Sequence, residues 1–399
     1  QAQLTYSYSG TQVTITGTGG IPVDKFYNST ITSVTMGNGV TSIGSYAFGY
    51  CASLTNVTIP NSVTNIGSYA FEYCTSLTNI IIPDSVTNIG SYAFYECHGL
   101  TSASIGANVT SIDHAFEYCT SLTNVVINNG VIGSYEFNYC ISLKSITIPA
   151  SITNIGSYAF ASCNGMTNVV INNSVISDYE FCNCASLTSI VIPASVTNIG
   201  SYVFVGCVNL TSIIIPASVT SIGSYVFLGC ARLTNVVINN GVIGDEEFYA
   251  CSRLTSITIP NSMTNIGSGA FEHCTSLTNL TFLGNAPALG DTNVFFSVNS
   301  NAIAYYYYGT TGWGTTYGGL LTVMLGAPAP QIGGGDSVGI HSGVFGFTLS
   351  GVSNQTVVVE ASTNLINWQP VWTSTLSGTS TNFTDSQWTN FPNRFYRAR

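Results

Sequence analysis

Charged residues are scarce in this sequence of 399 residues: lysine and arginine number 7, aspartate and glutamate 17, and the net charge is -10. Nucleic acids are recognised through basic patches, which so few basic residues do not supply, so we expect no nucleic-acid partner. The negative charge also opposes binding to anionic membranes. No apolar run approaches the length that crosses a bilayer, so we expect no membrane insertion.

Catalytic signatures are missing as well. The sequence contains no G-x-S-x-G, H-E-x-x-H, Walker or dinucleotide-binding motif, so we predict neither an enzyme nor a cofactor. The four histidines are scattered: His98, His114, His273 and His341. The acids nearest to a calcium site are Asp245, Glu246, Glu247 and Glu272. They lack the spacing of a calcium-binding loop, so we interpret them as a solvated edge and predict no metal.

What the sequence does contain is a repeat. Residues 54–76 read LTNVTIPNSVTNIGSYAFEYCTS, and a close copy begins at Leu77. The first apolar group of the repeat is Leu54, Val57 and Ile59, and the second is Val63, Ile66, Ala70 and Phe71. The first group fits the L-x-x-L-x-L pattern of a short strand. Because one copy cannot enclose both groups, successive copies must coil into a solenoid that buries them as one core.

Glycine and proline punctuate each copy, which we call a rung. The recurring glycines are Gly44, Gly67, Gly90, Gly156, Gly200, Gly223 and Gly267. We expect the coil to bend there through a conformation that only glycine adopts cheaply. The recurring prolines are Pro60, Pro83, Pro149, Pro193, Pro216 and Pro260. Proline cannot donate the next ladder hydrogen bond, so each should end a strand. No stretch from Ile31 to Phe282 has a sustained helical period, so we expect no long helix there.

The string IPxSVTxIGxYAFxxCxxL, repeated from Ile31 to Phe282, resembles the BspA-like leucine-rich repeats of bacterial surface and secreted proteins. The endings FLGNAPALG and YYYYGTTGWGTTYGG are similar to the closing segment of that family. The resemblance implies an all-β-rich solenoid, a right-handed coil of about 12 rungs, in an extracellular protein without enzymatic activity that serves adhesion or recognition. It names no ligand.

Five parts follow along the chain. Residues 1–30 contain an N-terminal β-hairpin cap around Ser9 and Gly10, and residues 31–282 form the solenoid. Residues 283–325 form a C-terminal cap, in which Tyr305 to Tyr308 and Trp313 cover the last rung. A Gly- and Pro-rich linker spans 326–335, and a small all-β domain, a sandwich by its strand spacing, spans 336–399. The segment from VVVEAS to NRFYRAR is similar to a C-terminal module of secreted proteins from environmental bacteria. Since Gln1 replaces methionine, we expect that a secretory signal was removed before it.

Cysteine occurs once per rung, at separations of 21 to 23 residues, in all but one of its 12 positions. Side chains stacked in register point in parallel, so we favour a column of buried, reduced thiols over disulfides. Cys182 lies off this column, and we expect it to be an exposed, reactive thiol or to make an unusual contact. Three rungs, at 125–137, 169–181 and 236–248, replace Pro by Asn and lack two turn residues. We expect a local change of curvature there and a strand ladder in register throughout.

Two further columns are candidate binding features. The first is an outward, β-branched stripe in the middle of the strand face: Ile81, Val126, Val170, Val191, Ile214 and Val237. It is either a strand preference or a buried contact, because contiguous exposed apolar surface is usually a binding face. The second is a tyrosine column, read as structural stacking in preference to a carbohydrate platform. It comprises Tyr46, Tyr69, Tyr92, Tyr135, Tyr158, Tyr179, Tyr202 and Tyr225. Tyrosines just before the cysteines, such as Tyr50 and Tyr73, occur only in the N-terminal half and indicate a contact surface.

The sequence therefore predicts an extracellular structural or adhesive protein that self-associates into a fibre or surface array. The contacts would come from the stripe and from the terminal domain, whose candidate residues are Trp368, Trp372 and Trp388. A nearly uncharged surface favours such contacts because copies repel each other little. The alternative is a monomeric cell-surface module that recognises a host protein or a glycan.

Overall fold

The computed structural model describes residues 3–128, 130–326, 329–333, 338–341, 344–391 and 393–399. The chain forms two compact units. The first comprises Gln1–Thr278 and Pro287–Ser300, and the second comprises Asn279–Ala286 and Asn301–Arg399. The finer division into caps, linker and terminal domain stays a prediction. Residues 327–328 and 334–335 of the predicted linker, and the start of the predicted domain at 336, lie outside the described residues.

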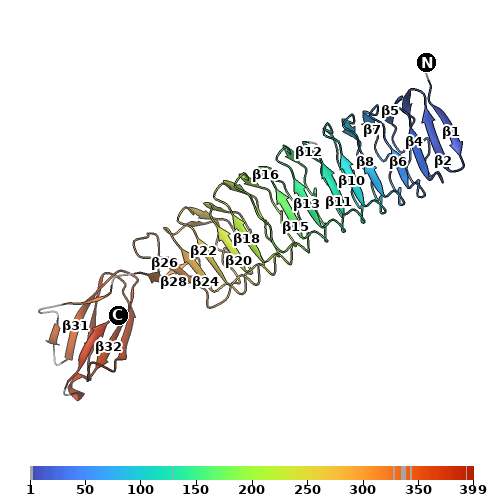
Figure 1. Cartoon of the computed structure of the whole chain (residues 1–399). Coiled ribbons are helices and arrows are strands. Elements are labelled where there is room, and N and C mark those ends of the chain that lie inside the picture. Colours follow the sequence, from blue (N-terminus) through green and yellow to red (C-terminus); the bar gives the residue numbers. More distant parts are fainter. Residues whose placement is uncertain (1–2, 129, 327–328, 334–337, 342–343, 392) are drawn as a thin grey trace. The chain divides into compact units, whose positions relative to one another are not determined.

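The first unit is the predicted solenoid, whose strands lie side by side along its length (Figure 1). Most rungs contribute a first strand and a second strand. The first strands are β2 Gln12–Thr16, β4 Ser33–Met36, β6 Asn56–Thr58, β8 Asn79–Ile81, β10 Ser102–Ile105, β11 Asn124–Ile127, β13 Ser145–Ile148, β15 Asn168–Ile171, β18 Ser212–Ile215, β20 Asn235–Ile238 and β22 Ser256–Ile259. The second strands are β3 Gly19–Ile21, β5 Val40–Ile43, β7 Asn65–Ile66, β9 Asn88–Ile89, β12 Val131–Ile132, β14 Asn154–Ile155, β16 Val175–Ile176, β17 Asn198–Ile199, β19 Ser221–Ile222, β21 Val242–Ile243, β23 Asn265–Ile266 and β25 Ala288–Leu289. In the described residues the rung of β10 has an isolated bridge at Ser111 in place of the second strand, and the rung of β17 has one at Ser189 in place of the first.

Both apolar groups of the repeat point inward, as predicted: Leu54, Ile66 and Phe71 have no solvent exposure. The phenylalanines of successive rungs stack, from Phe26 to Phe295, with ring centroids 5.1–5.9 Å apart. Burying one such side chain contributes roughly 1.5–3 kcal/mol. This gain recurs in every rung, so the solenoid is stabilised along its whole length by contacts between neighbours.

The prolines end strands as predicted, since β13, β18 and β22 stop at the residue before Pro149, Pro216 and Pro260. The expectation for the recurring glycines is wrong, because none of them has a positive φ. They are needed for close approach between rungs. A Cβ atom on Gly67 would lie 2.5 Å from the backbone nitrogen of Ser45 in the preceding rung.

The expectation of a ladder in register throughout is also wrong. The first strand of each short rung pairs with the preceding rung, as β11 pairs with β10, β15 with β13 and β20 with β18. The second strand pairs with the following rung, as β12 pairs with β14, β16 with β17 and β21 with β23. In the described residues, β11 and β13 belong to different sheets, and so do β20 and β22. β6 and β8, which belong to full-length rungs, also lie in different sheets, so the missing turn residues are not the only cause of such breaks.

The predicted N-terminal hairpin is confirmed. Strand β1 (Thr5–Ser9) pairs antiparallel with β2, and β2 continues in parallel into β4. The ring of Tyr6 meets the edge of Phe26 at 5.7 Å, and the Lys25 ammonium lies 4.2 Å from the centre of the Tyr6 ring. Tyr6 and the buried Val13 and Ile15 thus cover the open end of the phenylalanine stack.

The second unit contains the aromatic cap and a β-sandwich. The cap strands are β24 Asn279–Phe282, β26 Ile303–Tyr307, β27 Thr316–Tyr317 and β28 Leu320–Leu325. Within the cap, the ring centroid of Trp313 lies 4.9 Å from the ring centroids of both Phe282 and Tyr306. The sandwich strands are β29 Gln331–Ile332, β30 Val338–His341, β31 Val344–Ser350, β32 Thr356–Ser362, β33 Gln369–Thr375, β34 Ser380–Asp385 and β35 Phe395–Ala398.

Two sheets face each other in this sandwich: β29, β30, β31 and β34 form one, and β32, β33 and β35 form the other. Between them lie six buried hydrophobic residues, namely Phe347, Leu349, Val357, Val359, Leu376 and Phe383. The described residues include no α-helix, only the short 3-10 turn η2, Trp388–Asn390. The expectation of no long helix is therefore confirmed.

Candidate functional site

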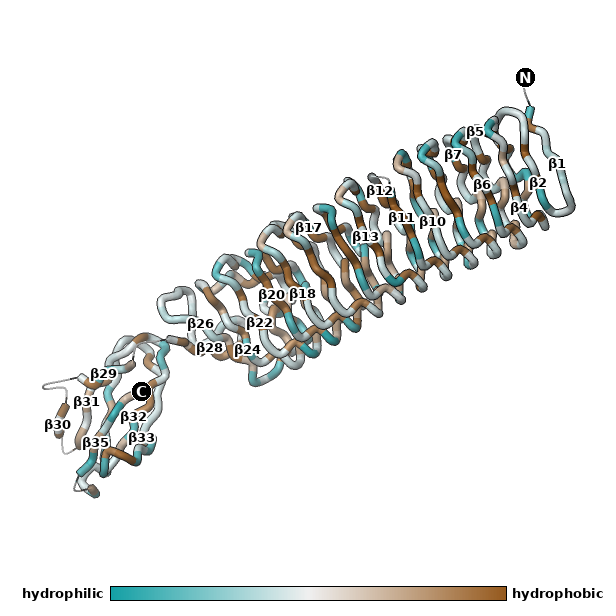
Figure 2. The backbone as a smooth tube through the Cα atoms, viewed as in Figure 1, coloured by the Kyte–Doolittle hydropathy of each residue, from teal (hydrophilic) through white to brown (hydrophobic). Residues whose placement is uncertain are grey.

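The predicted stripe is exposed on the outer face of the first strands. Its exposed fractions run from 37% for Val237 to 77% for Val191. Hydrophobic residues are frequent along the strands from β10 to β18 (Figure 2). The middle outward position is aliphatic in β11, β15 and β18, but it is Ser104 in β10 and Thr147 in β13. Ile214 and Val237 are register partners on paired strands, which places them about 4.8 Å apart. Val170, Val191, Ile214 and Val237 occupy consecutive rungs and leave apolar surface in water. Ser104 stands between Ile81 and Val126, and Thr147 stands between Val126 and Val170.

The threonine column beside the stripe does not offer free hydroxyl groups. The hydroxyl of Thr101 donates to the carbonyl oxygen of Thr78 at 2.9 Å, and the hydroxyl of Thr211 donates to that of Thr188 at 3.0 Å. The same bond is made by Thr55, Thr123, Thr167, Thr234 and Thr278, so these hydroxyls are not free donors on this face. The strand face is therefore suited to apolar packing more than to a ligand that needs many hydrogen bonds.

The three predicted tryptophans have separate environments in the sandwich. Trp372 meets Phe383 edge-to-face at 5.9 Å and packs against the core. The guanidinium of Arg397 lies over the ring of Trp368, with its Cζ atom 4.5 Å from the centre of that ring. Trp388 lies on η2 and lines a cavity. The structure does not gather the tryptophans into one site.

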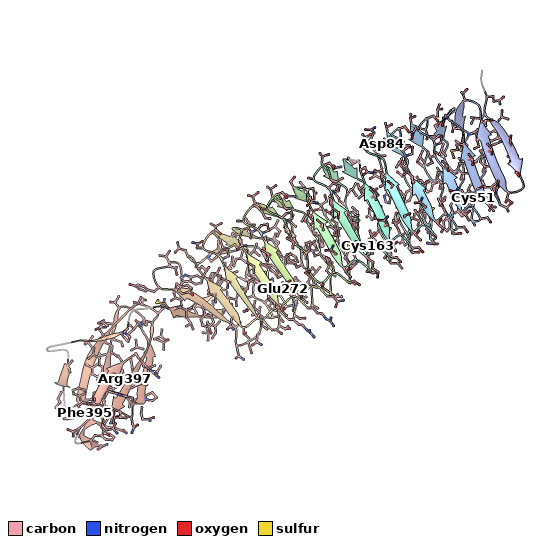
Figure 3. The ribbon with its side chains drawn as sticks, viewed as in Figure 1. Cys51, Asp84, Cys163, Glu272, Phe395 and Arg397 are labelled. Atoms are coloured by element: carbon pink, nitrogen blue, oxygen red, sulfur yellow. The ribbon has the colours of Figure 1, made fainter. Side chains whose placement is uncertain are left out.

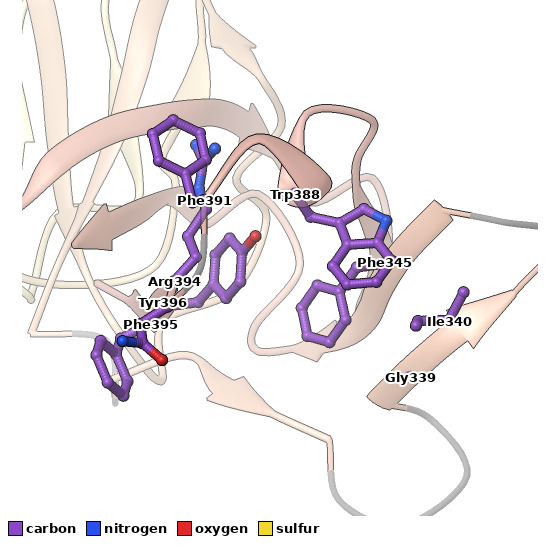
Figure 4. A pocket seen from close by; sticks show the side chains of 9 residues that line it. Gly339, Ile340, Phe345, Trp388, Phe391, Arg394, Phe395 and Tyr396 are labelled. Carbon is purple, nitrogen blue, oxygen red and sulfur yellow. The ribbon is translucent and has the colours of Figure 1, made fainter. Parts of the chain in front are cut away.

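The cavity beside Trp388 has a volume of about 600 Å³ (Figure 4). Phe345 and Trp388 form one wall, and Arg394 is stacked on Phe391 at 4.2 Å. The Nε of Arg394 lies 3.1 Å from Asp385, which also accepts a hydrogen bond from the Tyr396 hydroxyl at 2.7 Å. Burial and this hydrogen bond raise the pKa of Tyr396. Sequence reasoning missed the cavity because β30, η2 and β35 meet only through the tertiary fold.

The tyrosine column is a ladder of stacked rings. From Tyr46 to Tyr225, with His114 in one position, ring centroids lie 4.2–5.0 Å apart. Neighbouring rings cover each other's faces, so a sugar cannot stack on them in the way that a carbohydrate platform requires. Each ladder residue has a positive φ, between 53° and 63°. The sharp bend of the coil is therefore here and not at the recurring glycines.

The cysteines form the predicted column of buried, free thiols. Figure 3 marks two of them, Cys51 and Cys163. Each thiol donates to the carbonyl oxygen of a phenylalanine in the preceding rung, at 3.0–3.4 Å. The expectation of an exposed Cys182 is wrong. Only 8% of it is exposed, because it fills the space next to Phe181 that alanine or valine fills in neighbouring rungs.

Each short rung contains a buried glutamate, and the sequence had placed one of them, Glu247, on a solvated edge. That expectation is wrong, since Glu136, Glu180 and Glu247 are all buried. One carboxylate oxygen of each accepts a hydrogen bond from the backbone N–H three residues earlier, at 2.6–2.8 Å. The other oxygen has no partner in the described part of the chain. Burial raises the pKa of each of these carboxyl groups to about 8.

The repeats of this chain match a known family. The model of the BspA-type leucine-rich repeat region matches residues 20–132, 113–177 and 174–301, which is more than half of the chain. The chain belongs to the BspA-type leucine-rich repeat family. The resemblance stated from the repeat is confirmed, while the likeness of the terminal module to other secreted proteins stays a prediction. A search of curated proteins finds no match.

Solved structures with similar folds are bacterial leucine-rich repeat proteins. One from Bacteroides ovatus has a TM-score of 0.59 and 24% identity, covering 81% of this chain and 98% of its own. A leucine-rich cell surface protein from Faecalibacterium prausnitzii has a TM-score of 0.43 and 28% identity, covering 71% and 95%. The pneumococcal vaccine antigen PcpA has a TM-score of 0.42 and 16% identity, covering 77% and 92%. The first of these supports the solenoid fold.

The acidic and histidine side chains of this BspA-type repeat protein are spread along the chain. The described residues contain no group of three or more His, Cys, Asp or Glu side chains placed to hold a metal ion. His98, His114 and His273 each lie within 3.6 Å of a nearby glutamate. Within the ranges that the structure describes, no helix combines the length and hydrophobicity of a membrane span.

Proposed function

We propose that this protein is an extracellular or cell-surface protein that self-associates through the apolar stripe of its strand face. The observation that carries the proposal is the exposure of the stripe, which reaches 77% at Val191 and 54% at Ile214. Aliphatic side chains that leave this much surface in water gain free energy when a partner covers them. Membership of a family with bacterial surface proteins supports the location, and its repeat architecture supports a binding role without catalysis.

The sandwich is proposed to supply a second contact, with the cavity at Trp388 as its centre. Two different patches, one on each partner, give a head-to-tail contact that does not close on itself. Fibres or surface arrays are the expected products. The formal charge of -10 is small for 399 residues, so repulsion between copies is weak.

A monomeric binding module is the second candidate, and one observation favours it. A cavity of about 600 Å³ lies beside Ile81 at one end of the stripe. Its polar lining includes Asn61, Asp84, Asn108 and Asn128, and such amide and carboxylate groups match the hydroxyl groups of a glycan. Binding of a glycan at this place does not need a second copy of the chain.

The test replaces Val191 and Ile214 together by lysine. Two ammonium groups in a desolvated contact cost on the order of several kcal/mol, so self-association should be lost. The matched control replaces Ile141 and Val208 by lysine. These two are also one Ile and one Val, each 43% exposed, but they follow the cysteines and lie off the stripe. Sedimentation velocity that shows the same association for the stripe variant and the control would overturn the proposal in favour of the monomeric module.

A further inference from the structure

A second surface lies on the turn before the cysteines in the N-terminal rungs, away from the strand face. Its members, here called the tyrosine-glutamate patch, are Tyr27, Tyr50, Glu72, Tyr73, Tyr95 and Glu96. The tyrosine rings contact one another in sequence. Tyr50 lies 5.4 Å from Tyr27 and stacks on Tyr73 at 4.7 Å, and Tyr73 meets Tyr95 edge-to-face at 6.3 Å.

Glu72 lies within this patch without a partner. The residue is only 8% exposed as a whole, and among the described residues its carboxylate has no hydrogen bond or ion pair, so its oxygens face the solvent that remains. Glu72 directly precedes Tyr73 in the chain, and burial, followed by the charge of Glu72, raises the pKa of Tyr50. Burial and the neighbouring Glu96 raise the pKa of Glu72. By contrast, Glu117 binds His114 at 2.8 Å and Asn138 at 3.0 Å.

The basic side chain nearest to Glu72 along the chain is His98, which lies 3.5 Å from Glu96 and not at Glu72. No lysine or arginine occurs between Lys25 and Lys144, and the ammonium of Lys25 lies over Tyr6 in the N-terminal cap. A carboxylate at the edge of an apolar ring surface, with no lysine or arginine beside it, attracts a partner that brings a cation. The solenoid therefore has a negative site whose complement must come from another molecule.

Tyrosine is not the residue that the backbone favours in this patch. Tyr50 and Tyr73 have φ values of 58° and 56°, and later rungs have Gly206 and Gly229 at the equivalent position. Glycine adopts a positive φ without steric cost, whereas tyrosine does not. Tyr50 and Tyr73 thus hold this conformation at a cost that the rungs with Gly206 and Gly229 avoid.

We propose that the tyrosine-glutamate patch binds lysine or arginine side chains of a basic polypeptide segment. The aliphatic stem of such a side chain packs along tyrosine rings, and its cationic end reaches the carboxylate of Glu72. A metal ion fits less well, because no group of three metal-binding side chains exists in the described residues. This interaction goes beyond the proposed self-association, since it uses a different surface and a different partner.

The test measures binding of a short synthetic peptide of alternating lysine and serine to the full chain by calorimetry, at about 0.15 M salt. Glu72→Gln removes the charge with little change of shape and should weaken binding about ten-fold or more. Tyr73→Gly should weaken it as well, and its fold is preserved because glycine occupies this position in later rungs. The same peptide with acetylated lysines should not bind.

The matched control is Glu272→Gln. Glu272 follows Phe271 as Glu72 follows Phe71, but it lies 3.6 Å from His273 and outside the patch. This variant should bind the lysine peptide like the unmodified chain. Equal weakening by Glu72→Gln and Glu272→Gln, or binding of the acetylated peptide, would refute the proposal. Sedimentation of Glu72→Gln separates the two ideas: unchanged self-association supports a foreign partner, and lost self-association assigns the patch to a second copy and refutes the basic partner.

Discussion

The thiol of Cys163 donates a hydrogen bond to the carbonyl oxygen of Phe137 in the preceding rung, at 3.2 Å. The same relationship joins each column cysteine to the rung before it, so cysteine here is a small buried donor between stacked rungs. Burial raises the pKa of Cys163 to about 12, which keeps the thiol protonated at neutral pH. Reactivity requires the thiolate, so the column is chemically inert in the folded chain.

The first prediction is that almost none of the cysteine thiols in the native protein react with a thiol reagent. This includes Cys182, because it is buried and burial also raises its pKa. Thiol titration should find close to none of the 12 cysteines in the folded protein and all of them after denaturation. Fewer thiols in the denatured chain would mean disulfides and would contradict the column. If one thiol of the native protein reacts rapidly, and this reaction is lost in Cys182→Ala, then Cys182 is exposed after all.

The second prediction concerns the recurring glycines, at which the backbones of neighbouring rungs approach each other closely. Gly67→Ala should lower the unfolding midpoint, because its new Cβ meets the backbone of Ser45 and overpacking costs typically about 1–3 kcal/mol. The control is Gly130→Ala, whose Cβ would have an ordinary contact of 3.5 Å with Ser151. Its midpoint should stay nearly unchanged. Thermal melts followed by circular dichroism compare the two, and equal shifts would show that close approach does not explain the glycine column.

Much of this fold follows from periodicity alone. Leu54, Val57 and Ile59 recur with a strand spacing, and no other arrangement buries them in so many copies. The role of Gly67 does not follow from the sequence, because a glycine can serve either a turn with a positive φ or a close approach between two backbones. The positive φ belongs instead to Tyr46 and its equivalents, a conformation that propensity disfavours and that stacking between the rings of successive rungs stabilises.

The site was harder to predict than the fold. The exposure of Val191 and Ile214 follows from alternation along a strand, so the stripe could be named in advance. Glu180 could not be placed, because its burial depends on a turn shortened by two residues that brings the N–H of Ser177 to its carboxylate at 2.8 Å. The cavity at Trp388 depends on contacts between strands far apart in sequence, which no local pattern records.

The buried glutamates give the third prediction, which concerns pH. Their pKa is raised from 4.5 to about 8, so the folded chain holds protons that the unfolded chain releases between these values. Their contribution to stability is therefore fully present below about pH 4.5 and is lost as the pH rises through 8. Each glutamate contributes a slope of up to about 1.4 kcal/mol per pH unit. Urea denaturation of Glu180→Gln should show a flatter fall with pH than the unmodified chain, and an identical profile would contradict the buried neutral acid.

The final prediction separates the tryptophans of the sandwich. Trp372→Ala should destabilise this domain by roughly 1–3 kcal/mol, because the indole packs on Phe383 and against the core. Trp388→Ala should change the melting less but weaken self-association, because Trp388 lines the cavity proposed as the second contact. Melting curves and sedimentation velocity of both variants decide the point. If Trp388→Ala associates like the unmodified chain while Ile214→Lys with Val191→Lys does not, the strand face alone joins the copies and the sandwich has another role.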